Sequence, residues 1–434
     1  MSTMWYGKLP ERWETHRIKN LFQLRDERNF KPLSDVRLLS LYTAIGVKPH
    51  DEIERVAGNV AVTADNYKKV YKNDIVVNII LCWQGAIGLS KHDGVTSPAY
   101  YVYKAKSNNV NVDYFNYLFR TPFFYGECYK AGRGIMAMRW RTYSDEFTAI
   151  TVPLPPRAEQ DQIVRYLDWK VSRINKLINT KRRQIELLEE IKRAVINSIF
   201  TTKSNSWVNC RLKSLCRLKT GGTPKNNEGI NTDGNGYNWV TPSDFGTSQM
   251  IATTQKSIAE SIVLRDDVRL FPKDTILFIG IGGTLGKFAV LQCEGYSNQQ
   301  ITAIIPININ SKFLFYALTD KSNYIKSTAN YATLPIVNNV QLGKIKIPIP
   351  SQSEQLSTIA YLDKQCENID KIVFKFNDEI TLLTEYRTRL ISDVVTGKLD
   401  VRGVIVPEYE AVEEAVDAMG DAAEETDGEE NADE

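Results

Sequence analysis

The residue patterns in this sequence that come nearest to catalytic motifs lack the spacing that catalysis requires. Residues 280–286 have the spacing GxGxxxG and precede a strand-like run, so they do not match a dinucleotide-binding loop. Residues 286–288 lack the serine or threonine of a P-loop. The three histidines have no metal-ligand spacing, the six cysteines include no CxxC pair, and no Asn-Pro-Pro-Tyr-like tetrapeptide occurs. We therefore expect no enzyme active site, cofactor or metal in this chain.

Glycine-rich loops instead carry side chains that suit nucleic acid. Arg, Lys, Gln and Asn can pair with base edges, while Ser, Thr and glycine amides suit phosphates. Each loop alone is also typical of an ordinary turn. The candidates for DNA contact are Gln84, Lys91, His92, Arg133, Arg139 and Arg141 in residues 1–152, and Thr223, Lys225, Asn238, Ser243 and Lys287 in residues 203–347.

The net charge of +2 conceals a strong asymmetry along the chain. Residues 408–434 contain 13 acidic residues and no Lys or Arg, whereas residues 1–407 hold 54 basic and 39 acidic residues, a net charge of +15. A basic body favours phosphate binding because neutralised phosphates release counterions. A merely basic soluble protein has the same composition. The acidic end has few large apolar residues and is predicted to be disordered.

One long internal repeat organises the chain. Residues 153–203 and 348–398 align without a gap at an offset of 195, and residues 13–24 match residues 207–218 at an offset of 194. Between these segments the two halves diverge. The order is therefore a variable region, a repeated segment, a second variable region, a second repeated segment and an acidic end. Matching pairs include Pro155/Pro350, Glu159/Glu354, Gln160/Gln355, Tyr166/Tyr361, Leu167/Leu362 and Asp168/Asp363.

Both repeated segments are predicted to be long helices. Apolar residues recur at spacings of three and four, and each segment follows a proline-rich stop. A stripe of this length is typical of a coiled-coil seam, and the other copy is the nearest partner, in an antiparallel pair. Packing of each helix on its own domain remains the other reading. The stripes are Leu167, Val171, Ile174, Ile178, Lys181, Ile185, Leu188, Ile191 or Lys192, Val195 and Ile199, and Leu362, Cys366, Ile369, Val373, Phe376, Ile380, Leu383, Leu390 and Val394.

The variable regions carry β-branched and aromatic runs between turns, as in residues 74–81, 100–103 and 274–279. Such runs favour mixed α/β domains with largely antiparallel sheets. The predicted fold class is therefore α+β, with two such domains joined by two long antiparallel coiled-coil helices in a pseudo-two-fold repeat.

Specific motifs make the chain resemble the specificity subunits of type I restriction–modification enzymes. These motifs are TGGTPK at 220–225, NWVTPSD at 238–244, the run at 83–103, and the two proline-led helices with their EQ and YLD residues. The resemblance covers about residues 1–402. It implies target-recognition domains at 1–152 and 203–347, conserved helical regions at 153–202 and 348–402, and an acidic disordered tail at 403–434.

The resemblance also implies a function and partners. Each recognition domain would read one half of a bipartite double-stranded DNA target, while the helices set the gap and dock two modification (methyltransferase) subunits. Restriction (motor–nuclease) subunits would join the full complex, and the methyl donor and ATP would bind to these partners. Ser351 and Thr358 depart from Pro156 and Ile163 of the first copy, so the two docking surfaces need not be equivalent. The residues implied for docking are Glu159, Gln160, Tyr166, Glu354, Gln355 and Tyr361.

Two rival functions remain open from the residues alone. A coiled-coil adaptor without DNA contact would also need long helices, although the basic body argues against it. A self-contained nuclease or methyltransferase would need the motifs that are missing. No run of 18 apolar residues and no signal-peptide pattern occurs, so we expect a cytoplasmic protein without a membrane anchor.

Overall fold

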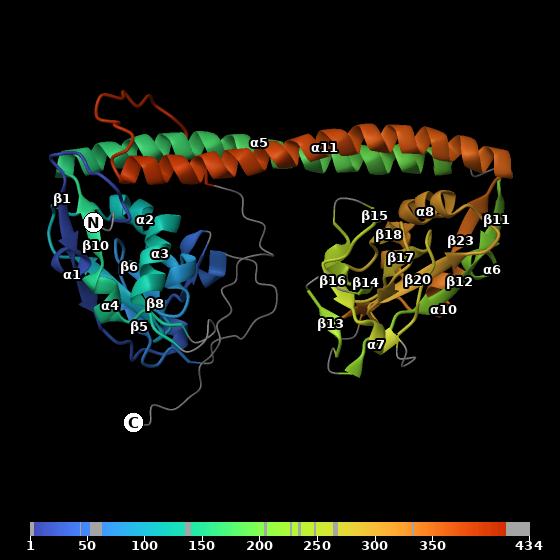
Figure 1. Ribbon diagram of the computed structural model, residues 1–434, viewed down its shortest axis with the longest axis horizontal. Helices are drawn as coiled ribbons and strands as arrows, with labels where there is room; N and C mark the ends of the chain where they lie inside the picture. Colours follow the sequence, from blue (N-terminus) through green and yellow to red (C-terminus); the bar gives the residue numbers. More distant parts are fainter. Residues whose placement is uncertain are drawn as a thin grey trace. The chain divides into compact units, whose positions relative to one another are not determined.

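A computed structural model describes most of the chain in two compact units (Figure 1). Unit 1 comprises Met1–Arg182 and Asn377–Glu434, and unit 2 comprises Arg183–Phe376. The described residues are 4–43, 45–52, 63–134, 140–203, 206–225, 228–232, 236–246, 249–263, 268–331 and 334–413.

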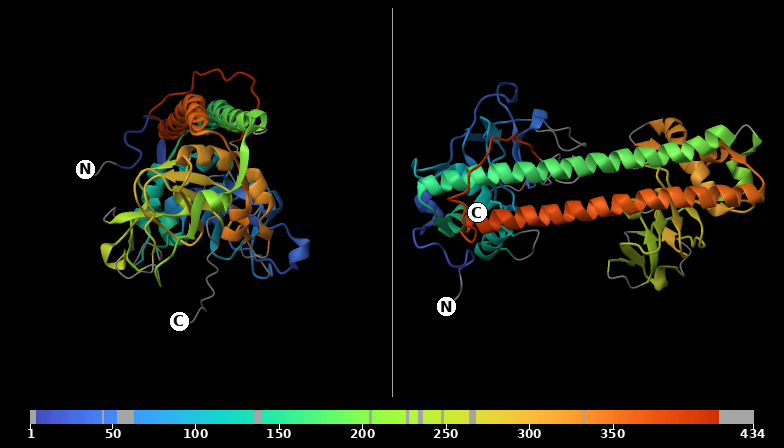
Figure 2. Two further views of the ribbon diagram at one scale, coloured as in Figure 1. Left: turned by 90° about the vertical axis from the view of Figure 1, so that its right-hand side faces the viewer. Right: turned by 90° about the horizontal axis from the view of Figure 1, so that it is seen from above.

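Two long helices carry the chain between the units. Helix α5 spans Arg157–Lys203 and helix α11 spans Gln352–Val395, so each unit contains one half of each helix. Figure 2 shows the two helices side by side. Antiparallel contacts join them within each unit: Lys181 to Glu379 at 2.7 Å in unit 1 and Lys192 to Asp370 at 2.7 Å in unit 2. The predicted antiparallel pair is therefore correct.

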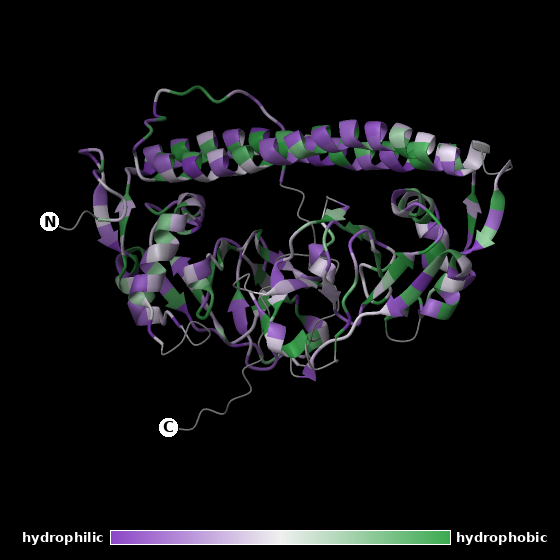
Figure 3. Cartoon of the chain, turned by 45° about the vertical axis from the view of Figure 1, so that its right-hand side comes forward, coloured by the Kyte–Doolittle hydropathy of each residue, from purple (hydrophilic) through white to green (hydrophobic). Residues whose placement is uncertain are grey.

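The predicted apolar stripes face the inside of the pair. Figure 3 shows hydrophobic and hydrophilic residues alternating along both helices, as expected when one side of each helix is buried. The sequence left open whether Ile191 or Lys192 belongs to the stripe of α5. Lys192 is buried and paired with Asp370, whereas Ile191 is 51% exposed. Fully or nearly fully buried seam residues are Leu167, Ile174, Ile178, Leu362, Cys366, Val373, Leu390 and Val394.

In unit 1 a four-stranded antiparallel sheet of order β2-β9-β6-β7 forms the centre of the globular domain. A separate two-stranded ribbon, β1-β10, connects the domain to α5. The elements are β1 Glu14–Arg17, α1 Ile18–Leu21, β2 Phe22–Arg25, β3 Leu39–Tyr42, β4 Gly46–Pro49, β5 Lys68–Val70, β6 Ile75–Asn78, η3 Cys82–Gln84, β7 Ile87–Leu89, β8 Gly94–Thr96, β9 Tyr100–Ala105, α2 Val112–Phe119, α3 Pro122–Ala131, α4 Ser144–Ala149 and β10 Thr151–Leu154.

Unit 2 repeats this plan with a five-stranded sheet of order β12-β20-β17-β18-β15 and a ribbon β11-β23. A second sheet, β13-β16-β14-β19, has no four-stranded counterpart among the described residues of unit 1. The elements are β11 Val208–Arg211, α6 Leu212–Leu215, β12 Cys216–Thr220, β13 Ile230–Asn231, β14 Tyr237–Val240, β15 Met250–Ile251, β16 Lys256–Ile258, α7 Glu260–Val263, β17 Ile276–Ile279, β18 Phe288–Leu291, β19 Tyr296–Ser297, β20 Ile301–Pro306, α8 Ser311–Asp320, α9 Ser322–Ser327, β21 Asn330–Tyr331, β22 Pro335–Ile336, α10 Asn339–Lys344 and β23 Lys346–Ile349.

The duplication therefore includes the two variable regions, whose sequences had suggested only divergence. Strands β6, β7 and β9 recur as β17, β18 and β20 at a constant offset of 201 residues, and the order of the sheets is the same. The predicted fold class is confirmed, including the mixed domains with largely antiparallel sheets.

A buried glutamine joins each domain to its helix. In unit 1, Gln160 accepts a hydrogen bond from the Asn111 backbone N–H at 2.8 Å and donates to the Pro155 carbonyl oxygen at 2.8 Å. In unit 2, Gln355 accepts from the Asn310 N–H at 3.2 Å and donates to the Pro350 carbonyl at 3.3 Å. Asn111 and Asn310 are themselves the N-caps of α2 and α8.

A tyrosine–aspartate hydrogen bond reinforces each joint. The Tyr117 hydroxyl donates to Asp168 at 2.7 Å, and the Tyr316 hydroxyl donates to Asp363 at 2.8 Å. Burial raises the pKa of Asp168 and that of Tyr117. The aspartates of the two YLD motifs thus hold α2 and α8 against the long helices.

Replacing the glutamine of the joint should destabilise unit 1. Gln160→Leu keeps the volume but strands a buried backbone N–H and a carbonyl, which should cost about 1–3 kcal/mol of unfolding free energy. Chemical denaturation followed by tryptophan fluorescence measures this. The matched control is Gln184→Leu on the exposed side of the same helix, which should change stability by no more than about 0.5 kcal/mol. Equal effects of the two variants would contradict the assigned joint.

Candidate nucleic-acid interface

Three loops predicted to contact DNA meet at one pocket of unit 2. Thr223 of the TGGTPK loop, Thr241 of the NWVTPSD loop and Ile281 of the third glycine-rich loop line a cavity of about 590 Å³. Trp239 forms part of its wall, and Lys256 lies at it with an exposed side chain. The pocket therefore combines hydroxyls and a cation, which suits a phosphate or a base edge.

The loops of this pocket have defined conformations. The Thr241 N–H donates to the Asp244 carboxylate at 2.7 Å, while Thr241 and Asp244 form a capping box around Pro242. Gly221 approaches the neighbouring turn so closely that a Cβ there would lie 2.3 Å from the Asn298 carbonyl oxygen. Close backbone approach thus requires the glycine of TGGTPK.

The predicted residues of unit 2 have different surroundings. The Asn238 side-chain amide is hydrogen-bonded within the protein. It donates to the Ala252 carbonyl at 3.3 Å and contacts the Cys293 sulfur at 3.0 Å, so it is not available to bind a base. Ser243 is exposed and bonds to Thr241. Lys225 and Lys287 are exposed, outside the set of residues that line the pocket.

The sequence prediction overlooked one segment of this pocket. Asn298, Gln299 and Gln300 form the turn between β19 and β20 and line the cavity. Their signal was present as three consecutive amide side chains between two apolar strands, but the prediction considered only glycine-rich loops.

In unit 1 an aromatic stack brings two predicted loops together. Trp83, Tyr129 and Trp140 pack in series, with ring centroids 5.7 Å and 4.9 Å apart. Gln84, exposed, follows Trp83 directly, and the backbone of Arg133 pairs with that of Arg141 beside Trp140.

The arginines of this cluster differ in their partners. Arg133 forms an ion pair with Glu146 at 3.0 Å and lies over the Tyr143 ring at 5.0 Å. Arg141 is exposed, and Arg139 lies outside the described residues. Gln84, Arg133 and Arg141 therefore form one group of candidate DNA contacts.

Lys91 and His92 belong to a separate group. His92 Nδ1 lies 3.3 Å from Arg37 Nη1, and Arg37 is held by Asp51 at 2.9 Å. Lys91 Nζ lies 3.7 Å from Glu413, a residue of the C-terminal segment.

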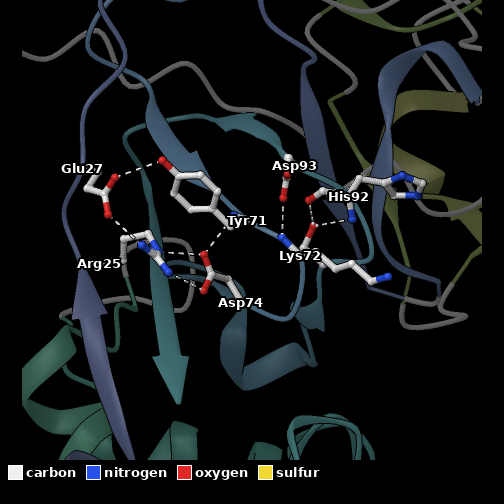
Figure 4. Close-up of polar contacts among 8 residues, drawn as sticks. Arg25, Glu27, Tyr71, Lys72, Asp74, His92 and Asp93 are labelled. Carbon is white, nitrogen blue, oxygen red and sulfur yellow. Dashed lines mark hydrogen bonds and ion pairs between the residues drawn. The ribbon is translucent and has the colours of Figure 1, made fainter. Parts of the chain in front are cut away.

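A polar network fixes the loop that carries Lys91 and His92 (Figure 4). Arg25 binds the buried Asp74 carboxylate through two hydrogen bonds of 2.8 and 3.2 Å, and Asp74 also accepts from the Tyr71 N–H. The next backbone N–H, that of Lys72, donates to Asp93 at 2.7 Å. Burial raises the pKa of Asp74 above its usual value, although the hydrogen bond from Arg25 acts in the opposite direction. The turn before β6 is thus tied to the loop after β7.

The start of the predicted disordered tail is ordered, so that boundary is wrong. Residues 403–413 run along α5, where Gln162 donates to the Val404 carbonyl at 2.7 Å and Asn175 donates to the Val412 carbonyl at 3.0 Å. Val404 and Val406 pack on the core of unit 1. Glu413 ends the segment with an ion pair to Lys48 at 2.8 Å. Apolar valines and helix amides therefore outweigh the acidic composition there, and residues 414–434 lie outside the described part.

The residues implied for partner docking divide into internal and surface groups. Gln160 and Gln355 are buried in the joints described above, so they are wrong as docking residues. Glu354 accepts from the Ser351 N–H and caps its own helix. Tyr166 is 7% exposed but Tyr361 is 48% exposed, so these two positions are not equivalent surfaces. Glu159 is partly buried, 3.9 Å from Arg402.

A different set of helix residues forms an exposed apolar surface. Five of them directly precede a seam residue, counting the buried Lys192, so these five lie on the same flank of the seam in both helices. The six residues match one another in pairs at the repeat offset of 195, and all six are 41–57% exposed. Unit 1 contains Leu177, Leu382 and Tyr386, and unit 2 contains Ile372, Leu187 and Ile191.

The described residues contain no group of three or more His, Cys, Asp or Glu side chains placed to hold a metal ion. Within the same residues, none of the helices combines the length and the apolar character needed to cross a membrane.

Comparisons with known proteins agree with this architecture. The model of the type I restriction modification DNA specificity domain matches the chain twice, over residues 10–187 and 204–382. The type I restriction enzyme MjaVIII specificity subunit of Methanocaldococcus jannaschii is 24% identical over 432 residues, which cover 92% of this chain and 95% of that protein. The EcoR124I/EcoR124II specificity subunit of Escherichia coli is 24% identical over 229 residues, covering 50% of this chain and 55% of that protein.

A solved structure shares the fold. It comes from work on complex assembly and conformational transition of the type I R-M system, and it superposes with a TM-score of 0.62 at 17% identity, over 90% of this chain and 100% of that one. The two family matches each contain one recognition domain and part of the helix that follows it. This chain therefore belongs to the family of type I restriction–modification DNA specificity proteins.

Proposed function

We propose that this protein reads a bipartite DNA target, one half with each recognition domain, and directs adenine methylation by modification subunits bound to it. Restriction subunits join the complex for cleavage. The methyl donor and ATP bind to these partners, and this chain contributes recognition alone. Its family membership as a DNA specificity protein supports the recognition role.

One observation carries the proposal: the same fold and the same joint occur twice with different loops. Each domain is fastened by a glutamine, an N-cap asparagine and a tyrosine–aspartate bond. The candidate contact surfaces differ, with an aromatic stack and arginines in unit 1 and an amide-lined and threonine-lined pocket in unit 2. Two similar scaffolds with unlike surfaces suit two unlike half-sites.

The exposed apolar residues of the helices support two docking sites for modification subunits. In an antiparallel pair, the same flank of each seam borders the same face, so each unit presents one three-residue apolar set. These leucine, isoleucine and tyrosine side chains are about half exposed, outside the buried seam, and their recurrence at the repeat offset favours two copies of one partner. The adaptor alternative would explain this surface but leaves the basic body and the two loop-rich domains without a role.

Methylome sequencing of the host with and without this gene tests the central proposal. We expect one class of methylated adenines to disappear with the gene, within a motif of two unlike halves separated by unread bases. Unlike halves follow from the different loops of the two domains. A single contiguous motif, or a methylome that does not change, would contradict the proposal.

Charged substitutions should remove the partner copies one at a time. Leu382→Glu in unit 1 and Leu187→Glu in unit 2 each place a carboxylate in an apolar interface, so each complex should retain one modification subunit, and the double variant none. Native mass spectrometry of the co-expressed complex measures the stoichiometry. Thr381→Glu, an exposed neighbour on another side of α11, is the matched control and should retain both copies. If the complexes with Leu382→Glu and Leu187→Glu also retain both modification subunits, the exposed apolar surface is not the docking site.

Removing one carboxylate from the C-terminal segment should strengthen DNA binding. Glu413 neutralises Lys48 at 2.8 Å and approaches the candidate contact Lys91 at 3.7 Å. Glu413→Gln frees both cations for phosphates, so affinity should rise a few-fold at low salt and the salt dependence should steepen. Fluorescence anisotropy at two salt concentrations measures both quantities. Glu408→Gln, an exposed carboxylate on the same segment, is the control, and an equal gain there would indicate only a change in net charge.

A further inference from the structure

One turn has the same hydrogen-bonding pattern in the two recognition domains although its three residues differ in type. In unit 2 the Ile301 N–H donates to the Asn298 carbonyl at 3.2 Å, and the Gln300 N–H donates to the Asn298 side-chain oxygen at 3.2 Å. In unit 1, at the offset of 201, the Tyr100 N–H donates to the Ser97 carbonyl at 3.1 Å, and the Ala99 N–H donates to the Ser97 hydroxyl at 3.4 Å. The backbone of this turn is therefore a fixed scaffold on which the side chains vary.

The side chains on the scaffold have different hydrogen-bonding chemistry. The turn of unit 2 is Asn-Gln-Gln at 298–300, whereas that of unit 1 is Ser-Pro-Ala at 97–99. A carboxamide can donate to N7 and accept from the N6 amino group of adenine at once, which makes it a specific reader of that base in the major groove. Proline and alanine have no such groups.

Within the amide triplet the three side chains have distinct roles. Asn298 donates to the Gln300 side-chain oxygen at 3.0 Å, so these two amides hold each other. Gln299 lies between them with an exposed side chain, and its amide has no hydrogen-bond partner in the described part of the chain. A rigid support with one unoccupied amide at its apex is the arrangement that direct base reading requires.

The surroundings of Gln299 suit DNA. It lines the 590 Å³ pocket together with Thr223, Thr241 and Lys256. The Thr223 hydroxyl and the Lys256 ammonium group can hold phosphates, which fixes the register of the duplex while an amide reads a base. The turn also joins the two sheets of unit 2, because β19 pairs with β14 and β20 pairs with β12 and β17. Both sheets thus fix its position.

We propose that Gln299 is a specificity-determining residue that reads an adenine in the half-site of the second recognition domain, with Asn298 and Gln300 as its positioning residues. This inference rests on the proposed function, and it adds the base class and the residue that reads it. The matching position of the first domain, Pro98, does not read a base through an amide, which contributes to the difference between the halves.

The test uses the full chain in its host, with the partner subunits present. Gln299→Ala should make one A·T position degenerate in one half of the methylated motif and leave the other half unchanged. Binding of the purified complex to its cognate site should weaken by roughly 5- to 100-fold, while non-specific DNA binding stays the same. Gln299→Glu can accept from the cytosine amino group but cannot donate to adenine N7, so the same position should shift toward C·G.

A control variant and the form of the methylated motif distinguish the possible results. Gln292→Ala removes another exposed glutamine of unit 2 that does not line the pocket, and it should leave the motif intact. An unchanged motif in Gln299→Ala and Gln299→Glu, with methylation still present, overturns the assignment of Gln299 alone. Uniformly weaker methylation without a change of motif also overturns it, because that result indicates a phosphate contact. If deletion of the gene leaves the methylome unchanged, the proposed function itself has failed.

Discussion

The structure depends on the burial of two apolar stripes against each other. Helix α5 and helix α11 each carry a stripe too long for either recognition domain to cover, and the antiparallel pair removes both stripes from water. Because the chain passes between the units only inside these helices, each unit is completed by a helical half from each repeat. The composition of each unit and the exposed apolar surface of the helices follow from this pairing.

Buried polar groups help to set the register of the pair. Lys192 is buried and reaches Asp370, and Asn175 accepts from Arg387 at 2.7 Å while donating to the Val412 carbonyl. A buried polar side chain without a partner is costly, so a shifted register would strand these groups. The same Asn175 also binds the C-terminal segment, which couples the ordering of residues 403–413 to the correct helix register.

Much of the architecture was predictable, because the relevant signals are periodic or repeated. Spacings of three and four indicated the helices, and an ungapped repeat indicated the antiparallel partner. The roles of Gln160 and Gln355 were not predictable, since a recurring polar residue at a helix start fits a docking surface as well as a buried joint. The ordered start of the tail was missed because the acidic composition of the whole tail dominated the prediction. That composition does not reveal that Val404 and Val406 pack on the core of unit 1. Asn238 and Gln299 show the limit for the candidate DNA site. Both are amides in polar stretches of the sequence, but Asn238 lies in β14 with its side-chain amide bonded within the protein, whereas Gln299 is exposed in a turn.

The interleaving of the two units has a consequence for how the protein is made. Unit 2 is one continuous segment, Arg183–Phe376, and its 194 residues separate the two parts of unit 1 in the chain. The first recognition domain emerges first during synthesis, yet the helical half that covers its side of α5, and the segment that binds Gln162 and Asn175, are made last. Its long-range contacts carry the larger loop-closure cost. The domain that is synthesised first is thus the last to be completed, and until then the apolar stripe of α5 in unit 1 stays uncovered and accessible to chaperones or to another chain.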